Sequence, residues 1–305
     1  MQSIIVYAGF VLIFIFFAIM LWDRGFVTVA NLTNILVQTA PATIMAIGLV
    51  FVLSSGEIDL SFGAIVALAA IVAALVMREA HWTLGVLAGL GTGVLAGAIN
   101  GAIVAYARLP SFLVTLATMG IIAGLARQIS DLQSISVTAR PFIAAFGGGK
   151  FLGIPSLVIW TLAALIIGHL VYRETRFGAH VLAVGDNARA ALVSGIKVAR
   201  IRMTVLMVSG LCAGLAGLLY AGRVQAARYT LGESDLMTVI AAVIVGGTAL
   251  YGGRGSIPGA LVGSLMMGML ANGLILMGLS VSWQMMIKGL IVLAAVAVSL
   301  REPNR

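Results

Sequence analysis

The sequence predicts an all-α membrane protein that crosses the bilayer about ten times. Of its 305 residues, 61% are hydrophobic and only 9% are charged. A soluble domain carries about 25% charged residues, so this chain has too few charges to cover a water-exposed surface. Its apolar residues also gather in runs of about 20, which is the length of a helix that spans a bilayer. We therefore expect one transmembrane domain over residues 1–305.

Ten apolar runs define the predicted spans. They cover residues 4–21, 35–53, 58–77, 82–106, 111–129, 156–172, 203–221, 237–250, 257–276 and 283–300. The N-terminal run lacks the features of a cleaved signal peptide, so we expect it to be retained. The run at 237–250 is short for a full crossing. Two joints, SSGEIDLSFG and TALYGGRGS, are short and contain glycine, so each is either a plain loop or a broken, re-entrant helix.

Basic residues favour an orientation with both chain ends in the cytoplasm. In this orientation the cytoplasmic segments hold ten of the 18 Lys and Arg residues and the outer segments hold seven. Cytoplasmic loops are enriched in Lys and Arg, which supports this choice. The net charge of +8 is then a feature of membrane orientation. We do not expect nucleic acid as a partner.

The longest polar interval, at residues 174–202, contains a short predicted helix. Asp186 and Asn187 are suited to accept hydrogen bonds from a first helical turn. Ala188, Ala191, Leu192 and Gly195 then follow at helical spacing, and Gly195 is suited to end the helix. We predict a cytoplasmic loop that carries an exposed helix on which another protein acts.

Glycines in the fourth span predict close helix packing. They recur at every fourth position, at Gly85, Gly89, Gly93, Gly97 and Gly101. Such a row removes the side chains from one ridge of a helix and lets a neighbouring backbone approach. The seventh and ninth spans repeat the pattern more briefly, with Gly210 and Gly214, and with Gly255, Gly259 and Gly263.

Two carboxylates at the joint of the second and third spans allow two interpretations. Glu57 and Asp59 lie among Ser54, Ser55 and Ser61. In the first interpretation the joint is a solvated loop in which Asp59 or Ser61 caps the third span. In the second, the acidic groups line or gate a polar path, because ionisable groups within a membrane are costly and usually functional.

The sequence contains no complete motif for enzymatic chemistry. The GGGKF segment at 147–151 lacks the glycine and the Ser or Thr of a phosphate loop, and GGRGSIPG at 252–259 has no strand before it. His81, His169 and His180 show no metal-ligand spacing, and Cys212 is the only cysteine. We predict no catalytic residue, no metal and no cofactor. Any active transport must then draw its energy from a partner or an ion gradient.

Five blocks of sequence resemble one known family. They are GEIDLSFGAIVAL at 56–68, LPSFLVTLATM at 109–119, TRFGAHVLAVGDNARAALVSGIKV at 175–198, DLMTVIAAVIVGGTALYGGRGSIPGALVG at 235–263 and ANGLILMGLSVSWQMMIKG at 271–289. In this order they resemble the membrane permeases of bacterial ABC importers for simple sugars, the ribose, xylose and galactose group. The resemblance covers nearly the whole chain.

This resemblance implies a fold, partners and candidate sites. It implies a type II permease of about ten helices, like that of the vitamin B12 importers, in the bacterial cytoplasmic membrane. It implies a pair of permeases, two ABC ATPase subunits, a periplasmic or lipid-anchored solute-binding protein and the surrounding lipid as partners. It implies that residues 185–196 form the coupling helix, which docks on the ATPase through Gly185, Asn187, Ala188, Ala191, Ser194, Gly195 and Ile196. For the substrate path, it suggests Asp59, Phe112, Thr115 and Asn272.

The chain departs from the family at two places. It has Gly56-Glu57-Ile58-Asp59 where the family usually has Gly-Gly-Ile-Asp or Ser-Gly-Ile-Asp, so Glu57 is an added carboxylate. The segment DLQSISVTARP at 131–141 also differs from the family's usual turn after the fifth span. Three alternatives stay open. They are an ABC permease for branched-chain amino acids, nucleosides or a sugar-derived signal; an ion-driven carrier or channel that needs no ATPase; and an intramembrane enzyme.

Overall fold

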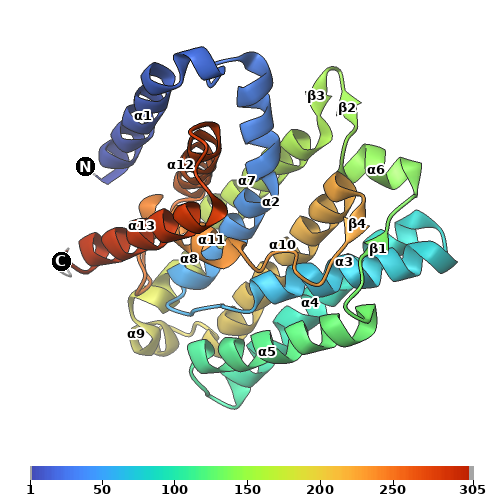
Figure 1. Cartoon of the computed structure of the whole chain (residues 1–305). Coiled ribbons are helices and arrows are strands. Elements are labelled where there is room, and N and C mark those ends of the chain that lie inside the picture. Colours follow the sequence, from blue (N-terminus) through green and yellow to red (C-terminus); the bar gives the residue numbers. More distant parts are fainter. Residues whose placement is uncertain (1, 302–305) are drawn as a thin grey trace.

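The computed structural model describes residues 2–301 and is built almost entirely of helices (Figure 1). Each predicted span contains one helix. These helices are α1 (Gln2–Met20), α2 (Val29–Ser54), α3 (Phe62–Glu79), α4 (Trp82–Tyr106), α5 (Ser111–Ser130), α7 (Ser156–Glu174), α10 (Val198–Val224), α11 (Asp235–Val245), α12 (Ile257–Leu276) and α13 (Val281–Arg301). The prediction of a polytopic all-α protein is confirmed.

Shorter elements connect these helices. They are η1 (Trp22–Arg24), α6 (Arg140–Phe146), α8 (Arg176–Asp186), α9 (Ala188–Val193) and four two-residue strands, β1 (Ile135–Ser136), β2 (Lys150–Phe151), β3 (Ile154–Pro155) and β4 (Ala226–Ala227). Among the described residues, seven helices are long and apolar enough to span a membrane: α2, α3, α4, α5, α7, α10 and α12. The run at 237–250, which we noted as short, forms a helix of only 11 residues, α11.

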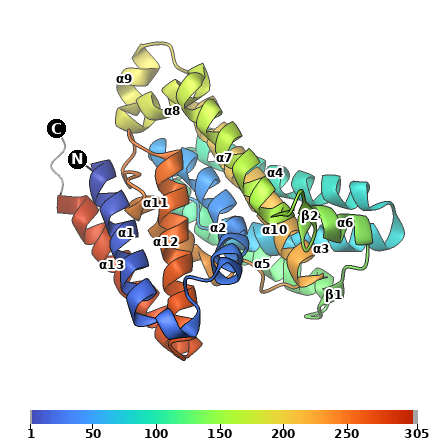
Figure 2. The ribbon, with the colours of Figure 1, turned by 90° about the horizontal axis from the view of Figure 1, so that it is seen from above.

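Contacts between connecting segments define two ends of the bundle. At the far end, β1 pairs with β4 in antiparallel register, and Arg24 Nη1 donates to the carbonyl oxygen of Leu276 over 2.7 Å. At the α9 end, the backbone N–H of Gly253 donates to the carbonyl oxygen of Ser54 over 3.0 Å. The joints before and after α2 therefore lie at opposite ends of the bundle. The start of α1 and the end of α13 lie near one another in both views (Figures 1 and 2).

Helix α2 lies at the centre of the core. Residues 39–54 are buried without interruption, and α2 packs against α7, α10, α11 and α12. On one side, α3, α4 and α5 form a layer, and α10 lies against α4 (Figure 1). The outward faces of α1, α4, α5 and α7 carry exposed apolar side chains. This distribution is the one expected of helices that contact lipid.

The glycine row of α4 allows close crossings with α3 and α10. A Cβ atom at Gly93 would overlap the carbonyl oxygen of Gly210, and one at Gly97 would overlap that of Leu206. Gly85 and Gly89 face α3, and Gly101 faces Met203. The predicted packing role of the row agrees with these contacts, in which backbone touches backbone and dispersion and weak polar contacts replace side-chain packing.

We predict that Gly93→Ala destabilises the protein by about 1–3 kcal/mol, because the added methyl group must push α4 and α10 apart. Gly91 provides a matched control on the same helix, since a Cβ atom there meets nothing within 4 Å. Thermal unfolding of the two purified variants in detergent tests the difference. Equal melting temperatures for Gly93→Ala and Gly91→Ala would contradict the packing role.

Candidate functional site

A glycine cap ends α2 and starts the joint that carries the two carboxylates. Gly56 has φ +79°, and its N–H donates to the carbonyl oxygen of Leu53. The N–H of Glu57 donates to the carbonyl oxygen of Val52. This pattern is a Schellman motif, which needs a left-handed residue at the position of Gly56. The chain then continues irregularly to Phe62, so α3 begins four residues later than the predicted span at 58–77.

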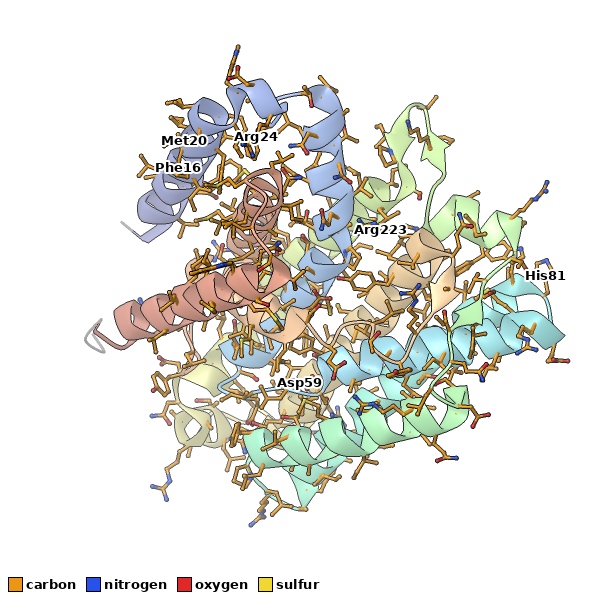
Figure 3. All side chains as sticks on the ribbon, in the orientation of Figure 1. Phe16, Met20, Arg24, Asp59, His81 and Arg223 are labelled. Carbon is orange, nitrogen blue, oxygen red and sulfur yellow. The ribbon has the colours of Figure 1, made fainter. Side chains whose placement is uncertain are left out.

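Asp59 is the centre of a buried hydrogen-bond network in this joint (Figure 3). Its side chain is 1% exposed. Oδ1 accepts from the backbone N–H of Ser61 at 2.8 Å and from its hydroxyl at 2.6 Å, and Oδ2 accepts from the hydroxyl of Ser209 on α10 at 2.7 Å. Asn100 of α4 donates to Ser61 Oγ over 2.8 Å. One carboxylate thus joins α3, α4 and α10.

The two interpretations of the joint can now be separated in part. Ser61 is the N-cap residue of α3, but its side chain makes no capping bond. Asp59 does hold the backbone at the helix start, through the N–H of Ser61. The expectation of a solvated loop is wrong, because Asp59 is shielded from water by the helices around it.

The same joint is bound to α5 through its backbone. The N–H of Ile58 donates to Ser111 Oγ over 3.0 Å, and the hydroxyl of Thr115 lies 3.2 Å from the carbonyl oxygen of Ile58. Thr115 thus contacts the backbone of the residue that precedes Asp59, and both side chains are buried. The sequence analysis missed Ser111 and Ser209, because a lone serine in an apolar helix carries no distinguishing pattern.

Phe112 lies beside this network, on a cavity of about 310 Å³ at the α9 end. Glu57, Arg108 and Arg202 also line this cavity. Arg202 Nε lies 2.6 Å from Glu57 Oε1, although the N–H is not directed at that oxygen, so the contact is an ion pair without an aligned hydrogen bond. The added carboxylate of this chain thus links the α2–α3 joint to the start of α10.

Asn272 lies apart from the other suggested path residues, near the far end. Its side-chain amide and that of Asn31 each donate to the other's Oδ1 over 2.9 Å. Asn31 also donates to the carbonyl oxygen of Phe26. The pair ties the start of α2 to α12. Asn272 thus joins other elements than Asp59 does, and its place on the substrate path stays a prediction.

The polar interval at 174–202 folds into two short helices. Thr175 caps α8, and Asn187 caps α9 by accepting from the backbone N–H groups of Arg189 and Ala190. Gly195, with φ +86°, follows α9, and the N–H groups of Gly195 and Ile196 donate to the carbonyl oxygens of Leu192 and Ala191. The predicted cap at Asn187 and the predicted stop at Gly195 are therefore confirmed, whereas Asp186 is the last residue of α8.

Helix α9 offers an exposed apolar surface. Leu192 is 62% exposed and Val193 is 86% exposed, whereas Ala191 is buried and Ala188 and Ile196 pack partly against the core. Ser194 and Gly195 are exposed beside them. The sequence analysis did not single out Val193, although its apolar side chain is more exposed than that of Leu192.

Gly185 belongs to α8 and not to the short helix. A Cβ atom there would overlap the carbonyl oxygen of Ser54, and one at Gly252 would overlap Gly185. The backbones of α8, of the end of α2 and of the loop at 246–256 therefore meet at this point. Both glycine-containing joints lie here, side by side. Gly185 thus connects α9 to the α2–α3 joint and is not itself part of the exposed surface.

The structure places no metal cluster in this region. Among residues that the structure describes, no group of three or more His, Cys, Asp or Glu side chains lies close enough to hold an ion. The site joins an exposed apolar helix, through backbone contacts, to a buried carboxylate at a helix break.

Comparisons with known proteins identify the family of this chain. A family described as the permease component of the branched-chain amino acid transport system matches residues 31–296. The chain belongs to this permease family. It is thus a multi-pass transport protein of the inner membrane.

Three relatives align over most of their length. The ribose import permease RbsC of Bacillus subtilis is 37% identical over 99% of this chain and 94% of its own length. RbsC of Escherichia coli K12 is 36% identical over 91% of this chain and 88% of its own. The L-arabinose ABC transporter permease AraH of Azospirillum brasilense is 35% identical over 98% of this chain and 88% of its own. No solved structure matches the chain.

We predict that Asp59→Ala destabilises the protein by about 2–6 kcal/mol. The change leaves the hydroxyls of Ser61 and Ser209 without their acceptor, and each buried unsatisfied group costs about 1–3 kcal/mol. Asp23→Ala, at an exposed position of η1, provides the control. Thermal unfolding in detergent gives the readout, and an unchanged melting temperature for Asp59→Ala would show that the network contributes no stability.

Proposed function

We propose that the chain is the transmembrane permease subunit of an ATP-driven importer for a small sugar. ABC ATPase subunits, a solute-binding protein and a second permease are its partners. The observation that carries the coupling role is the exposed apolar tip of α9, formed by Leu192 and Val193. A large apolar side chain exposed to water on a well-capped helix is typical of a binding surface for another protein.

The orientation follows from the same assignment. The α9 end faces the cytoplasm, where ATPase subunits lie, and both chain ends lie on that side. The far end, with η1 and the β1–β4 and β2–β3 pairs, faces the binding protein. The basic residues of α8, α9 and the start of α10 support this orientation.

The transport step is a rocking of the bundle that α9 drives. Movement of α9 reaches Ser54 through Gly185 and then the joint at residues 55–61. Asp59 and Glu57 each bond this joint to α10, at Ser209 and Arg202. Packed interfaces of this kind switch between discrete arrangements, so a small shift at α9 can open one end and close the other.

The proposed solute is a small sugar, because three relatives are named as permeases for ribose or arabinose. The matching family carries the name of branched-chain amino acid transport. Uptake of radiolabelled ribose, arabinose and leucine by the assembled importer separates these solutes. ATP-dependent uptake of leucine without uptake of either pentose would overturn the sugar assignment.

The double variant Leu192→Asp/Val193→Asp tests the coupling role. We expect at least a tenfold loss of the ATPase subunit that co-purifies with the permease, because two carboxylates would be buried in an apolar contact. Sugar uptake should fall in parallel, while the amount of permease in the membrane stays unchanged. Leu152→Asp, on the exposed turn between β2 and β3, makes the same chemical change at the far end.

Full recovery of the ATPase with the double variant would contradict this role for α9. Uptake into liposomes by the chain alone, driven by an ion gradient, would contradict the importer itself.

A further inference from the structure

A second cavity, of about 460 Å³, lies at the α9 end between α1, α7, α8 and the loop before α12. The glycine-rich segment at 253–259 forms one of its walls. In the sequence this segment has the glycines of a nucleotide-binding motif but no strand before it. It is not part of the exposed surface of α9. Val6 and Tyr7 of α1 form part of the opposite side.

The lining of this cavity is cationic. Arg173 and Arg254 contribute their side chains, and no Asp or Glu is among the lining residues. Neither arginine lies within 4.0 Å of a carboxylate in residues 2–301, in contrast to Arg127 and Arg202. His169 adds a ring nitrogen, Nδ1, that is shielded from solvent and has no hydrogen-bond partner within the described part of the chain. The cavity thus presents donors and positive charge without a matching acceptor.

An exposed apolar ridge leads away from this cavity along α1. Tyr7, which lines the cavity, is 49% exposed, and Val11, Ile15 and Ile19 follow at steps of four residues, all exposed. Phe16 and Met20 are exposed on the same helix (Figure 3). A cationic cavity at the membrane interface therefore continues into a surface suited to a hydrocarbon chain.

We propose that this cavity binds the phosphate group of an anionic phospholipid from the cytoplasmic leaflet, with an acyl chain along the Tyr7–Ile19 ridge of α1. Basic pockets between transmembrane helices on the cytoplasmic side suit such headgroups. Arginine offers paired donors that match phosphate oxygens. The bound lipid would hold α1 against the loop that contacts Gly185, and so would bias the coupling connection. The choice of leaflet rests on the proposed orientation, whereas the binding itself does not depend on the ATPase or the solute.

Native mass spectrometry of the purified full-length chain, titrated with phosphatidylglycerol, tests the proposal. We expect one tightly bound lipid, and about a thirtyfold higher apparent Kd in Arg173→Gln/Arg254→Gln, since each basic residue near an anionic headgroup contributes about fivefold. Lys197→Gln/Arg200→Gln removes the same charge from exposed positions at the same end and should bind as the wild type does. Phosphatidylcholine should bind at least about tenfold more weakly than phosphatidylglycerol.

Three results would overturn the proposal. The first is equal affinity of the Arg173/Arg254 variant and the wild type. The second is equal loss in both double variants, which would indicate unspecific attraction to charge. The third is displacement of the lipid by glycerol 3-phosphate at equal concentration, which would assign the cavity to a soluble phosphate ester. If the glutamine variant does not fold, Arg173→Lys/Arg254→Lys replaces it in the test. This variant keeps the charge, so we expect it to retain most of the lipid binding.

Discussion

Glycine-permitted contact between backbones is the constraint on which the bundle depends. Within a membrane, lipid tails surround apolar side chains as favourably as other helices do, so helices are held by close packing and polar contacts. In this chain α4 crosses α10 at Gly93 and Gly210, α12 meets α11 at Gly259 and Gly246, and α8 meets α2 at Gly185. At each crossing a side chain would force the elements apart. The bundle therefore has a few points of very close backbone contact.

The candidate site uses one of these tight points to connect surface and interior. Helix α9 follows α8 directly, since Asn187 is both the residue that ends α8 and the N-cap of α9. The contact at Gly185 brings α8 against the last residue of α2, and the Schellman motif at Gly56 carries the chain from there to Asp59. The carboxylate of Asp59 is bonded to α10, the helix that follows α9 in the chain. In the proposed mechanism, a displacement at α9 reaches the same joint from two directions.

Local features of the sequence were predictable, and long-range pairings were not. The ten helices follow from runs of apolar residues, and the ends of α9 follow from the chemistry of Asn187 and Gly195. By contrast, Ser209 meets Asp59 across 150 positions of the chain, and Asn272 meets Asn31 across 241. Such pairings depend on the rotation of each helix in the folded bundle, which hydrophobic periodicity determines only to within a face. The suggested path residues were therefore partly dispersed.

The central claim is that the contact at Gly185 transmits movement from α9 to the α2–α3 joint, and Gly185→Ala tests it most directly. The variant should be assembled with its ATPase and binding protein in liposomes, beside Gly120→Ala, whose Cβ atom meets nothing within 4 Å. We predict that Gly185→Ala still binds the ATPase, while sugar uptake per ATP hydrolysed falls at least about tenfold, since the added methyl group wedges α8 away from Ser54. Wild-type uptake per ATP in a stably folded Gly185→Ala variant would contradict the account.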